Sequence, residues 1–439
     1  MSHAESLKQN INNASAVIGV IGLGYVGLPL ALAFAEKGFS VLGFDVDPEK
    51  GRKIAAGECY IKHLEGARLK SVVEQDRFKA TSDFSRLGEP DVLIICVPTP
   101  LTPQREPDMS YVVSTTEEIK KHLRAGQLVI LESTTYPGTT DELVKGILDQ
   151  TGLTLGSDYF LAFSPEREDP GNPKFETRTI PKVVGGVDQV SGDLAESLYA
   201  KAIQKTVRVA SARAAEASKL TENIFRAVNI ALVNELKVVY DRMGIDIWDV
   251  LDAASTKPFG FMRFNPGPGW GGHCIPLDPF YLSWKAREYG IQPKFIELAG
   301  DVNVAMPEYV IQKLQLALND RKKPVKGSKI LVLGLAYKKD IDDPRESPAF
   351  EIIEHLLHLG AEVSYHDPHV PFAPSMRTWP DLPQMRSVPW TEDVLKGTDA
   401  VIIVTDHSSV DYDLLLRAAS LIVDTRGVFR ESRPNVVKA

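Results

Sequence analysis

The sequence predicts an α/β protein in which two doubly wound parallel-sheet domains are joined by a central domain built on one long helix. Short apolar runs of strand type alternate with helical segments near the N-terminus, and the same strand–turn–helix–strand order returns in the last third. Between them, 214–243 is nearly free of Gly and Pro and carries apolar residues at helical spacing. We therefore expect domains at 1–211, 212–310 and 311–439.

The N-terminal domain opens with a glycine turn between a strand and a helix. A strand is expected over 16–21, a helix over 28–37 that ends at Gly38, and a second strand over 39–44. In this setting two glycines allow a tight turn and the approach of a pyrophosphate to the helix N-terminus, while the third allows helix–strand packing. An acid after the second strand binds a ribose hydroxyl and favours NAD over NADP. The residues that we expect to bind NAD are Gly22, Gly24, Tyr25, Val26, Gly27 and Asp45.

Further strands are expected over 92–97, 128–132 and 159–164, with a final strand over 181–186. Ligands of an open parallel sheet bind beyond the carboxyl ends of its strands. The loops that follow the first three of these strands should therefore face the cofactor. They contain Thr99, Thr134 and Glu166.

The long helix over 214–243 would span about 45 Å at ~1.5 Å per residue. Lys219 and Asn223 are four residues apart on it and share a face. A helix of this length between two nucleotide folds is suited to connect domains and to form a dimer core. For Lys219 alone, a solvated surface position is the ordinary alternative.

A loop rich in Gly and Pro, 265–279, contains one thiol and one carboxylate, Cys274 and Asp278. Its glycines permit close backbone approach to a ligand, and a thiol near a base is suited to covalent catalysis. A tight structural loop with a buried cysteine explains the same residues, and the loop itself leaves both interpretations open.

The C-terminal domain repeats the N-terminal order with a strand over 329–335, a helix over 347–359 and a strand over 362–367. Gly334-Leu335-Ala336 replaces the full glycine fingerprint, so we expect no second dinucleotide there. Later strands are expected over 400–404 and 421–424. A charged loop after the first strand contains Lys338 and Arg345, which suit phosphate binding or simple solvation.

The composition excludes several classes of function. A formal net charge of −8 argues against a general nucleic-acid surface. Three dispersed cysteines, Cys59, Cys96 and Cys274, fit a reducing compartment, and Cys96 falls in an apolar strand of core type. The nine histidines form no ligand cluster along the chain, so we expect no metal. Neither a signal-peptide layout nor a bilayer-length apolar run is present, and we expect a cytoplasmic protein without membrane contacts.

In combination and in this order, several motifs resemble the UDP-glucose/GDP-mannose dehydrogenase family. The resemblance covers nearly the whole chain, 16–430, and implies two Rossmann-like domains joined by a central helical domain. It also implies an enzyme that oxidises the 6-hydroxyl of a nucleotide sugar to a carboxylate and reduces two NAD per turnover, and a homodimer or higher oligomer. The motifs are the glycine turn, Ser164-Pro165-Glu166, the Lys219 and Asn223 pair, Gly271-Gly272-His273-Cys274 and Arg345-Glu346-Ser347.

The resemblance implies a role for each matching residue. Cys274 matches the nucleophile, and Lys219 and Asn223 match the pair that stabilises the oxyanion. Asp278 matches a carboxylate that assists proton transfer, and Glu166 and Thr134 match residues around the water that hydrolyses a thioester. The cofactor contacts implied in addition to the glycine turn are Asp45, Lys50, Thr99, Thr134 and Arg345. The substrate contacts implied are Glu166, Arg167, Lys219, Asn223, Arg263, Gly271 and Lys338.

Three features bring the resemblance nearest to the branch that acts on N-acetylhexosamines: His273 before the cysteine, Leu277 after the proline, and the segment 164–172. UDP-N-acetylglucosamine is the substrate implied, for bacterial surface polysaccharide synthesis, with UDP-N-acetylmannosamine and UDP-glucose as alternatives. Two other interpretations remain. One is a two-electron dehydrogenase with Lys219 as base and a structural Cys274, and the other is an NAD-sensing or scaffold protein with an inactive site.

Overall fold

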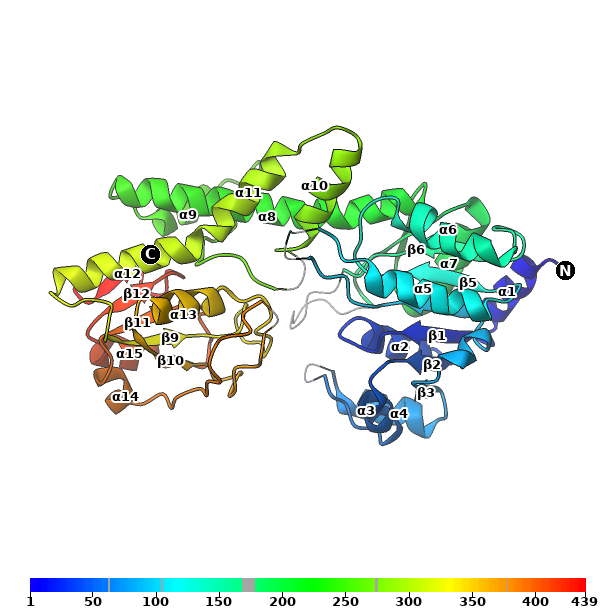
Figure 1. Ribbon diagram of the computed structural model, residues 1–439, viewed down its shortest axis with the longest axis horizontal. Helices are drawn as coiled ribbons and strands as arrows, with labels where there is room; N and C mark the ends of the chain where they lie inside the picture. The colour runs from blue at the N-terminus through cyan, green and yellow to red at the C-terminus, as the bar shows by residue number, and fades with distance from the viewer. Residues whose placement is uncertain (62–63, 103, 105, 168–177, 273–274, 377) are drawn as a thin grey trace. The chain divides into compact units, whose positions relative to one another are not determined.

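The computed structural model describes residues 1–439 except 62–63, 103, 105, 168–177, 273–274 and 377 (Figure 1). The described residues form two compact units, one of 1–222 with 284–290 and the other of 223–283 with 291–439. Helix α8 (Ala212–Arg242) contributes residues to both units. The three-domain division at 211 and 310 stays a prediction.

The first unit contains an eight-stranded sheet. Its strands are β1 (Val17–Ile21), β2 (Ser40–Phe44), β3 (Phe78–Thr81), β4 (Val92–Ile95), β5 (Leu128–Leu131), β6 (Phe160–Phe163), β7 (Lys182–Gly186) and β8 (Thr206–Arg208). They lie in the order β3-β2-β1-β4-β5-β6-β7-β8, so the chain winds outward from β1 in both directions, as the sequence predicts. All the neighbouring pairs are parallel except β6 and β7.

One strand prediction was wrong in part. The segment expected over 181–186 does form β7, but it is not the final strand of the sheet. A helix returns the chain to form β8, which pairs with β7 in parallel. The short β8 is only partly buried and consists of one threonine, one valine and one arginine, so the sequence shows no apolar run there.

Helices cover both faces of this sheet. The helices of the first unit are α1 (His3–Asn12), α2 (Gly27–Ala35), α3 (Pro48–Ala55), α4 (Gly66–Glu74), α5 (Ser110–His122), α6 (Lys145–Leu148) and α7 (Gln189–Ala202), with the short turns η1 (Phe84–Gly88), η2 (Thr139–Val144) and η3 (Asp149–Thr151). Alternate strand residues such as Val20 and Ile94 pack against α1, α2 and α7, whereas Ile21 and Ile95 pack on the other face with α5. Burial on both faces explains why the central strands are continuous apolar runs.

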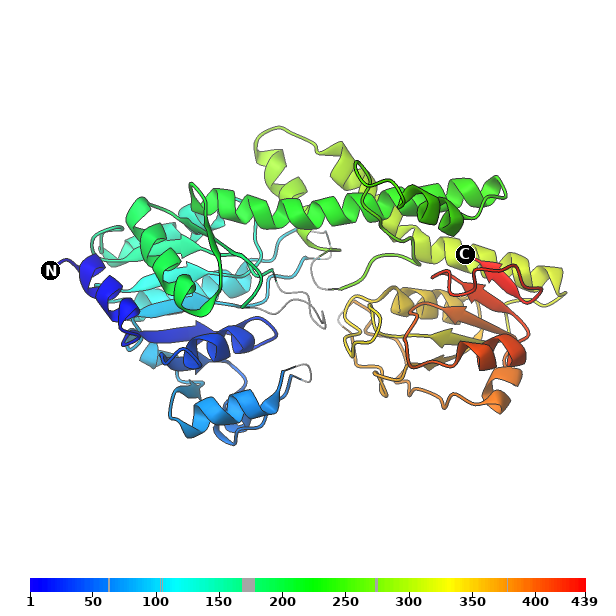
Figure 2. The ribbon, with the colours of Figure 1, turned by 180° about the vertical axis from the view of Figure 1, so that it is seen from behind.

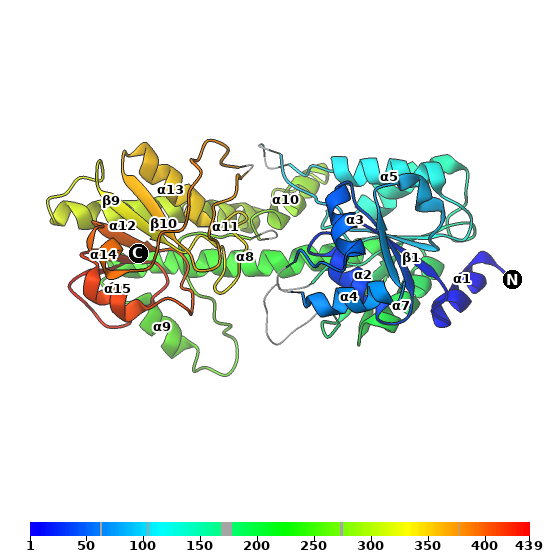
Figure 3. The same ribbon diagram turned by 90° about the horizontal axis from the view of Figure 1, so that it is seen from below.

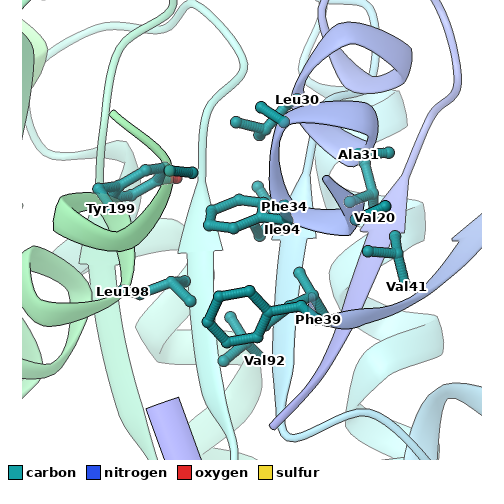
Figure 4. Packing of buried hydrophobic residues seen from close by; sticks show 14 of the residues in the cluster. Val20, Leu30, Ala31, Phe34, Phe39, Val41, Val92, Ile94, Leu198 and Tyr199 are labelled. Atoms are coloured by element: carbon teal, nitrogen blue, oxygen red, sulfur yellow. The ribbon is translucent and has the colours of Figure 1, made fainter. Parts of the chain in front are cut away.

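Figure 4 shows the core beneath α2 and α7. The ring of Phe34 meets the ring of Phe39 edge-on, with centroids 5.9 Å apart, and lies 6.0 Å from the ring of Tyr199. Edge-to-face pairs of this kind add to the free energy gained by burying the rings. The core therefore fixes Tyr199 from α7 close to the central strands.

The second unit combines helices with a five-stranded sheet. Its strands are β9 (Lys329–Leu333), β10 (Glu362–His366), β11 (Ala400–Ile403), β12 (Ile422–Asp424) and β13 (Val436–Lys438). They lie in the order β10-β9-β11-β12-β13, and every pair is parallel. The helices that follow α8 are α9 (Ile247–Ala254), α10 (Asp278–Glu288), α11 (Lys294–Val304), α12 (Met306–Asp320), α13 (Pro348–His358), α14 (Glu392–Lys396) and α15 (Tyr412–Ala418).

This second sheet is also doubly wound. Ile330 and Val332 pack with α12 and α13 on one face, and Leu331 and Leu333 pack with α14 and α15 on the other. Figure 3 shows α13 beside β9 and β10. The order β9, α13, β10 repeats the order β1, α2, β2, as the sequence predicts.

The predicted long helix is confirmed as α8, which runs without interruption over 31 residues and is coloured green in Figure 2. Among the residues that the structure describes, no helix is both long enough and apolar enough to cross a membrane.

Candidate active site

The glycine turn after β1 has the backbone of a dinucleotide site. Gly22 adopts φ +92°, a conformation that side chains disfavour. A Cβ atom on Gly27 would lie 1.8 Å from the carbonyl oxygen of Gly22, so only glycine lets α2 approach the turn this closely. A Cβ atom on Gly24 would meet nothing within 4 Å, and this open side is where a pyrophosphate would fit.

Asp45 follows β2, next to this turn, and its side chain is 8% exposed. Its carboxylate accepts hydrogen bonds from the backbone N–H of Leu23 at 2.8 Å and of Asp47 at 3.0 Å. The ammonium of Lys50 lies 2.9 Å from the same carboxylate. Asp45 is thus fixed beside the turn at the position from which an acid binds the adenosine ribose, and the set of donors and acceptors fits NAD.

The structure brings Thr99, Thr134 and Glu166 to one edge of the first sheet. They follow β4, β5 and β6, which are parallel neighbours, so their loops leave from the same carboxyl edge. This edge is the one at which the glycine turn follows β1. The expectation that the three loops lie on the cofactor side agrees with this topology.

Lys219 reaches this edge from α8. Its buried ammonium donates a hydrogen bond to the backbone carbonyl oxygen of Glu166. The next side chain, Arg167, donates 2.7 Å to the carbonyl oxygen of Pro181 and pairs with Glu222 at 2.7 Å. Lys219 is therefore not the solvated surface lysine of the ordinary alternative.

Three residues at the same edge were missed by the sequence analysis. Glu132 follows β5 directly, Lys182 opens β7, and Tyr199 lies on α7, and all three side chains are buried. The Lys182 ammonium lies 2.9 Å from the Glu132 carboxylate, and the Tyr199 hydroxyl donates to the other oxygen of Glu132. For Glu132 and Lys182, the available signal was a charged residue at the end of an apolar strand run.

The three cysteines differ in what the structure describes. Cys59 and Cys96 are free thiols, and burial raises the pKa of Cys96 well above its usual value. Cys96 packs against the core, as expected, and stays a neutral thiol at neutral pH. Cys274 and the neighbouring His273 lie outside the described residues.

Asn223 and Asp278 form a buried pair in the second unit. The Asn223 side-chain amide donates a hydrogen bond to the carboxylate of Asp278, the first residue of α10. Although Asn223 and Lys219 share a face of α8, the hydrogen bonds given above join them to different groups. Asn223 orients an acid, and Lys219 holds a backbone carbonyl.

The described glycines of the loop before Cys274 approach the chain itself. A Cβ atom on Gly272, which has φ +90°, would lie 2.8 Å from the ring of Tyr337, and one on Gly271 would lie 2.9 Å from the carbonyl oxygen of Glu346. The backbone N–H of Gly272 donates to the carbonyl oxygen of Arg345. The glycines therefore let this loop pack onto the charged loop that follows β9.

Arg345, predicted as a cofactor contact, and Arg263, predicted as a substrate contact, have partners within the second unit. The Arg345 guanidinium holds the carboxylate of Asp343, with Nε 2.8 Å from Oδ1. Arg263 donates 2.9 Å to the side-chain oxygen of Asn265 and pairs with Asp252 at 2.5 Å. Lys338 lies partly exposed in the loop after β9. The proposed contacts of Arg345 with cofactor and of Arg263 and Lys338 with substrate stay predictions.

Among the described residues, one group of potential metal ligands comes together, which the sequence analysis did not expect: Asp340, His369 and His407. His407 already has partners for both ring nitrogens. Its Nδ1 accepts the backbone N–H of Asp340 at 3.0 Å, so its Nε2 carries the proton and donates to Asp367 at 3.1 Å. Both ring nitrogens of His407 are therefore already used in hydrogen bonds within the chain, whereas Nε2 of His369 is buried and, among the described residues, has no hydrogen-bond partner.

Asp367 is the counterpart of Asp45 in the second unit, since it follows the second strand of the repeat. It is buried and accepts N–H groups from Leu335 at 2.7 Å and Ala336 at 2.9 Å, in the turn after β9. Two more N–H groups, from His369 and Val370, donate to its other oxygen. With His407 added, five donors from the chain itself bind this carboxylate, and the absence of a second dinucleotide stays a prediction.

A doubly wound sheet with this glycine turn and a fixed acid after β2 defines an NAD-binding oxidoreductase. Three domain models of one family match the chain, agree with the structure and specify the family. The NAD-binding domain of the UDP-glucose/GDP-mannose dehydrogenase family matches 16–203, its central domain matches 213–305, and its UDP-binding domain matches 331–431. The chain belongs to the UDP-glucose/GDP-mannose dehydrogenase family, and it is an NAD-dependent nucleotide-sugar dehydrogenase.

Relatives with named activities cover most of the chain. UDP-N-acetyl-D-mannosamine dehydrogenase of Pyrococcus horikoshii is 36% identical over 421 residues, which are 94% of this chain and 96% of that protein. UDP-N-acetyl-D-glucosamine 6-dehydrogenase of Pseudomonas aeruginosa is 38% identical over 355 residues, which are 80% and 83%. A solved structure of the Pyrococcus horikoshii enzyme superposes with a TM-score of 0.86 at 34% identity and covers 96% of this chain and 98% of that chain.

Proposed function

We propose that the protein oxidises the C6 hydroxyl of UDP-N-acetylglucosamine to a carboxylate in two NAD-dependent steps, through a thioester on Cys274. The observation that carries this proposal is the hydrogen bond from Lys219 to the backbone of Glu166 at the carboxyl edge of the first sheet. It places a buried ammonium beside the loop of a carboxylate, where developing negative charge needs a fixed cation. The product would serve bacterial surface polysaccharide synthesis.

The proposed reaction consists of two oxidations at C6 and one hydrolysis. Loss of a proton and a hydride from the C6 alcohol gives an aldehyde, and addition of the Cys274 thiol gives a thiohemiacetal. Loss of a second proton and hydride gives a thioester, and water cleaves it to the carboxylate, the thiol and a third proton. NAD, when bound, accepts one hydride in each oxidation.

The candidate site residues have the following roles in this proposal. The Lys219 ammonium and the Asn223 amide stabilise the oxyanion on the reacting carbon. Asp278, which Asn223 orients, assists proton transfer, and the Glu166 carboxylate with Thr134 binds the hydrolytic water. Gly22, Gly24, Gly27 and Asp45 hold the dinucleotide.

The sugar is proposed from the relatives. The Pseudomonas aeruginosa relative is named for UDP-N-acetyl-D-glucosamine, at the higher identity of 38%. The Pyrococcus horikoshii relative is named for UDP-N-acetyl-D-mannosamine and matches more of the chain, 94%. UDP-N-acetylmannosamine is therefore the second candidate, and the two sugars differ only in configuration at C2.

A panel of UDP-sugars tests the proposal directly. The purified protein is incubated with NAD and UDP-N-acetylglucosamine, UDP-N-acetylmannosamine or UDP-glucose, and NADH is followed by absorbance while the acid is measured by mass spectrometry. We expect two NADH per molecule of uronate with one N-acetylhexosamine. One NADH per sugar, with an aldehyde or ketone product, would establish the two-electron alternative instead, and no turnover with any sugar would favour a sensor or scaffold.

The covalent step has its own test. The protein is quenched during turnover, and we expect a mass increase corresponding to the bound sugar nucleotide on the peptide that contains Cys274. Cys274→Ser should bind NAD normally but release no uronate. Full uronate production by this variant would refute the covalent role.

We also propose that the protein is a homodimer or a higher homo-oligomer that associates through α8. Phe225, Leu232 and Val239 are spaced seven residues apart on this helix and are 47%, 50% and 45% exposed. Residues seven apart lie nearly above one another, so the three form one apolar stripe. An exposed stripe of large apolar side chains is characteristic of a protein–protein interface.

A further inference from the structure

A buried ion cluster lies at the carboxyl edge of the first sheet. The Lys182 ammonium, at the start of β7, is 2.9 Å from an oxygen of Glu132, the residue after β5. The hydroxyl of Tyr199 on α7 donates to the second oxygen of Glu132. Glu132 therefore has a partner for each oxygen, and Lys182 is held in one position from two elements.

The same ammonium also faces Glu166. Its nitrogen is 3.8 Å from Oε2 of Glu166, whose side chain is 14% exposed, whereas Lys182 and Glu132 are 5% and 0% exposed. Glu166 is thus the member of the cluster that reaches the surface of the sheet edge. On its backbone side, the carbonyl oxygen of Glu166 is held by Lys219. Cations on two different elements, β7 and α8, therefore bracket this one residue.

Lys182 is the cation of the buried ion pair that faces the Glu166 carboxylate. The groups that face it are Lys182, Glu132, Tyr199, Cys96 and Lys219. Burial raises the pKa of Tyr199 and of Cys96, so both stay neutral at neutral pH. Burial alone would lower the pKa of Lys182, but Glu132 and Glu166 outweigh it, and the pKa is raised. Two carboxylates thus share one permanent buried cation.

Removing that cation would change Glu166 in a predictable way. Without the cation, the buried Glu132, whose pKa burial already raises, takes up a proton, and Glu166 loses the positive charge 3.8 Å away that favours its ionised form. A buried ion pair is also a poor source of stability compared with apolar packing, so stability alone does not explain a lysine at this position. Its distinctive effect is on the carboxylate at the exposed end of the cluster.

We propose that Lys182 is a positioning residue that keeps the Glu166 carboxylate charged and fixed at the edge of the first sheet. Where Glu166 binds the hydrolytic water, a role that rests on the function proposed above, this charge is what lets the carboxylate take a proton from the water as it attacks. Lys182 acts through Glu166 and needs no contact with the substrate.

The test measures the titration of Glu166 without substrate. The full-length protein is labelled with ¹³C-glutamate, and the carboxylate band of Glu166 is isolated by infrared difference against Glu166→Gln. Two variants are compared, Glu132→Gln and Glu132→Gln with Lys182→Met, so that only the cation differs between them and an oxygen at position 132 still accepts from Tyr199. We expect the midpoint of Glu166 to be higher in the double variant than in Glu132→Gln by about one pH unit or more. Lys182→Arg with Glu132→Gln should restore the lower midpoint, and the matched control Tyr199→Phe, which keeps all charges, should leave the wild-type midpoint unchanged.

Activity supplies the second readout. In the double variant we expect the acidic limb of the rate of uronate release to move to higher pH by the same amount, with NAD affinity unchanged. An unchanged midpoint for Glu166 in the folded double variant would overturn the proposal. Should that variant not fold, the ¹⁵Nζ resonance of Lys182 in the wild-type protein decides, since it must follow the titration of Glu166 and lose this dependence in Glu166→Gln.

The outcomes separate this inference from the proposed function. A shifted midpoint with one NADH per sugar in the wild-type protein supports the charge control by Lys182 and refutes the thioester route. An unshifted midpoint with two NADH per sugar refutes the role of Lys182 and leaves the proposed function standing.

Discussion

The side-chain amide of Asn223 on α8 donates a hydrogen bond to the carboxylate of Asp278, which lies 55 residues further along the chain and begins α10. Both side chains are buried. A buried carboxylate requires hydrogen-bond donors, and an amide in its place would offer two N–H donors and one fewer acceptor oxygen. The pair therefore has a polarity, with a donor on α8 and an acceptor on α10.

Asn223→Asp should destabilise the second unit. The change places a second carboxylate against Asp278 in a buried position, and an uncompensated buried charge costs roughly 3–5 kcal/mol. We expect this loss in the free energy of unfolding at pH 7, measured by urea denaturation. The loss should shrink at lower pH, where one carboxyl group of the pair becomes protonated.

The double variant Asn223→Asp with Asp278→Asn serves as the control. It reverses the polarity of the hydrogen bond and should recover most of the stability. Its activity should stay low, because Asn223 and Asp278 are proposed to act on different groups during catalysis. Recovery of both stability and activity would show that the pair has only a structural role.

Asp45→Asn should weaken NAD binding. The carboxylate beside the glycine turn is fixed by Leu23 N–H and Lys50, and a hydrogen bond to a charged group contributes about 1.5–3 kcal/mol. We expect the Kd for NAD, measured by calorimetry, to rise about 10- to 100-fold, and the preference over NADP to fall. Asp47→Asn, two residues away on the exposed cap of α3, should bind NAD normally.

Lys237→Met should stabilise the protein at neutral pH. Among the described residues, the buried ammonium of Lys237 on α8 has no hydrogen-bond partner, and burial lowers its pKa to about 7. Methionine has a similar length without the amine, so we expect a gain of about 1–3 kcal/mol in the free energy of unfolding at pH 7. A loss of stability at pH 7 would show that Lys237 has a partner.

The gain in stability should depend on pH, because folding lowers the pKa of Lys237. Between pH 7 and the ordinary lysine pKa of 10.5, the unfolded chain binds more protons at Lys237 than the folded chain does, so the wild-type stability rises with pH. The methionine variant lacks this slope, and its advantage should therefore fade toward pH 10.5. Lys294→Met, an exposed lysine on α11, should show neither the gain nor the pH dependence.

Leu232→Glu should weaken self-association. A charge in the middle of the stripe formed by Phe225, Leu232 and Val239 opposes burial of the stripe against a second copy. We expect the sedimentation coefficient at micromolar concentration to fall to that of a monomer. Glu235→Gln, a helix residue that the stripe does not include, is the control. A wild-type protein that sediments as a monomer would refute the proposed dimer outright.

The central strands of both sheets follow from the sequence because they are buried on both faces. Continuous apolar runs identify β1, β4, β5 and β6, and the parallel order then follows from the glycine turn and the helices between them. The strands that the sequence analysis missed all lie at sheet edges, where partial burial produces no apolar run. They are β3, β8 and β13.

The candidate site divides in the same way. The rule that ligands bind beyond the carboxyl ends of strands was sufficient to bring Thr99, Thr134 and Glu166 to one edge. Lys182 could not be found by this rule, because β7 runs antiparallel to β6 and brings its first residue, not its last, to that edge. The spacing of residues along the chain gives no indication of this reversal. Glu132 does follow β5, but the sequence analysis placed it inside the expected strand 128–132.

The aspartates at equivalent positions in the two sheets, Asp45 and Asp367, differ in how many donors of the chain bind them. Asp45 accepts from two backbone N–H groups and Lys50, whereas Asp367 accepts from four backbone N–H groups and His407. Grafting a complete glycine fingerprint onto the second turn, for instance by Ala336→Gly, would therefore not create a second coenzyme site. A second coenzyme site would first require removal of the hydrogen bonds that the chain makes to Asp367. The C-terminal sheet would then lose the hydrogen bond from His407 that joins the end of β10 to the segment after β11.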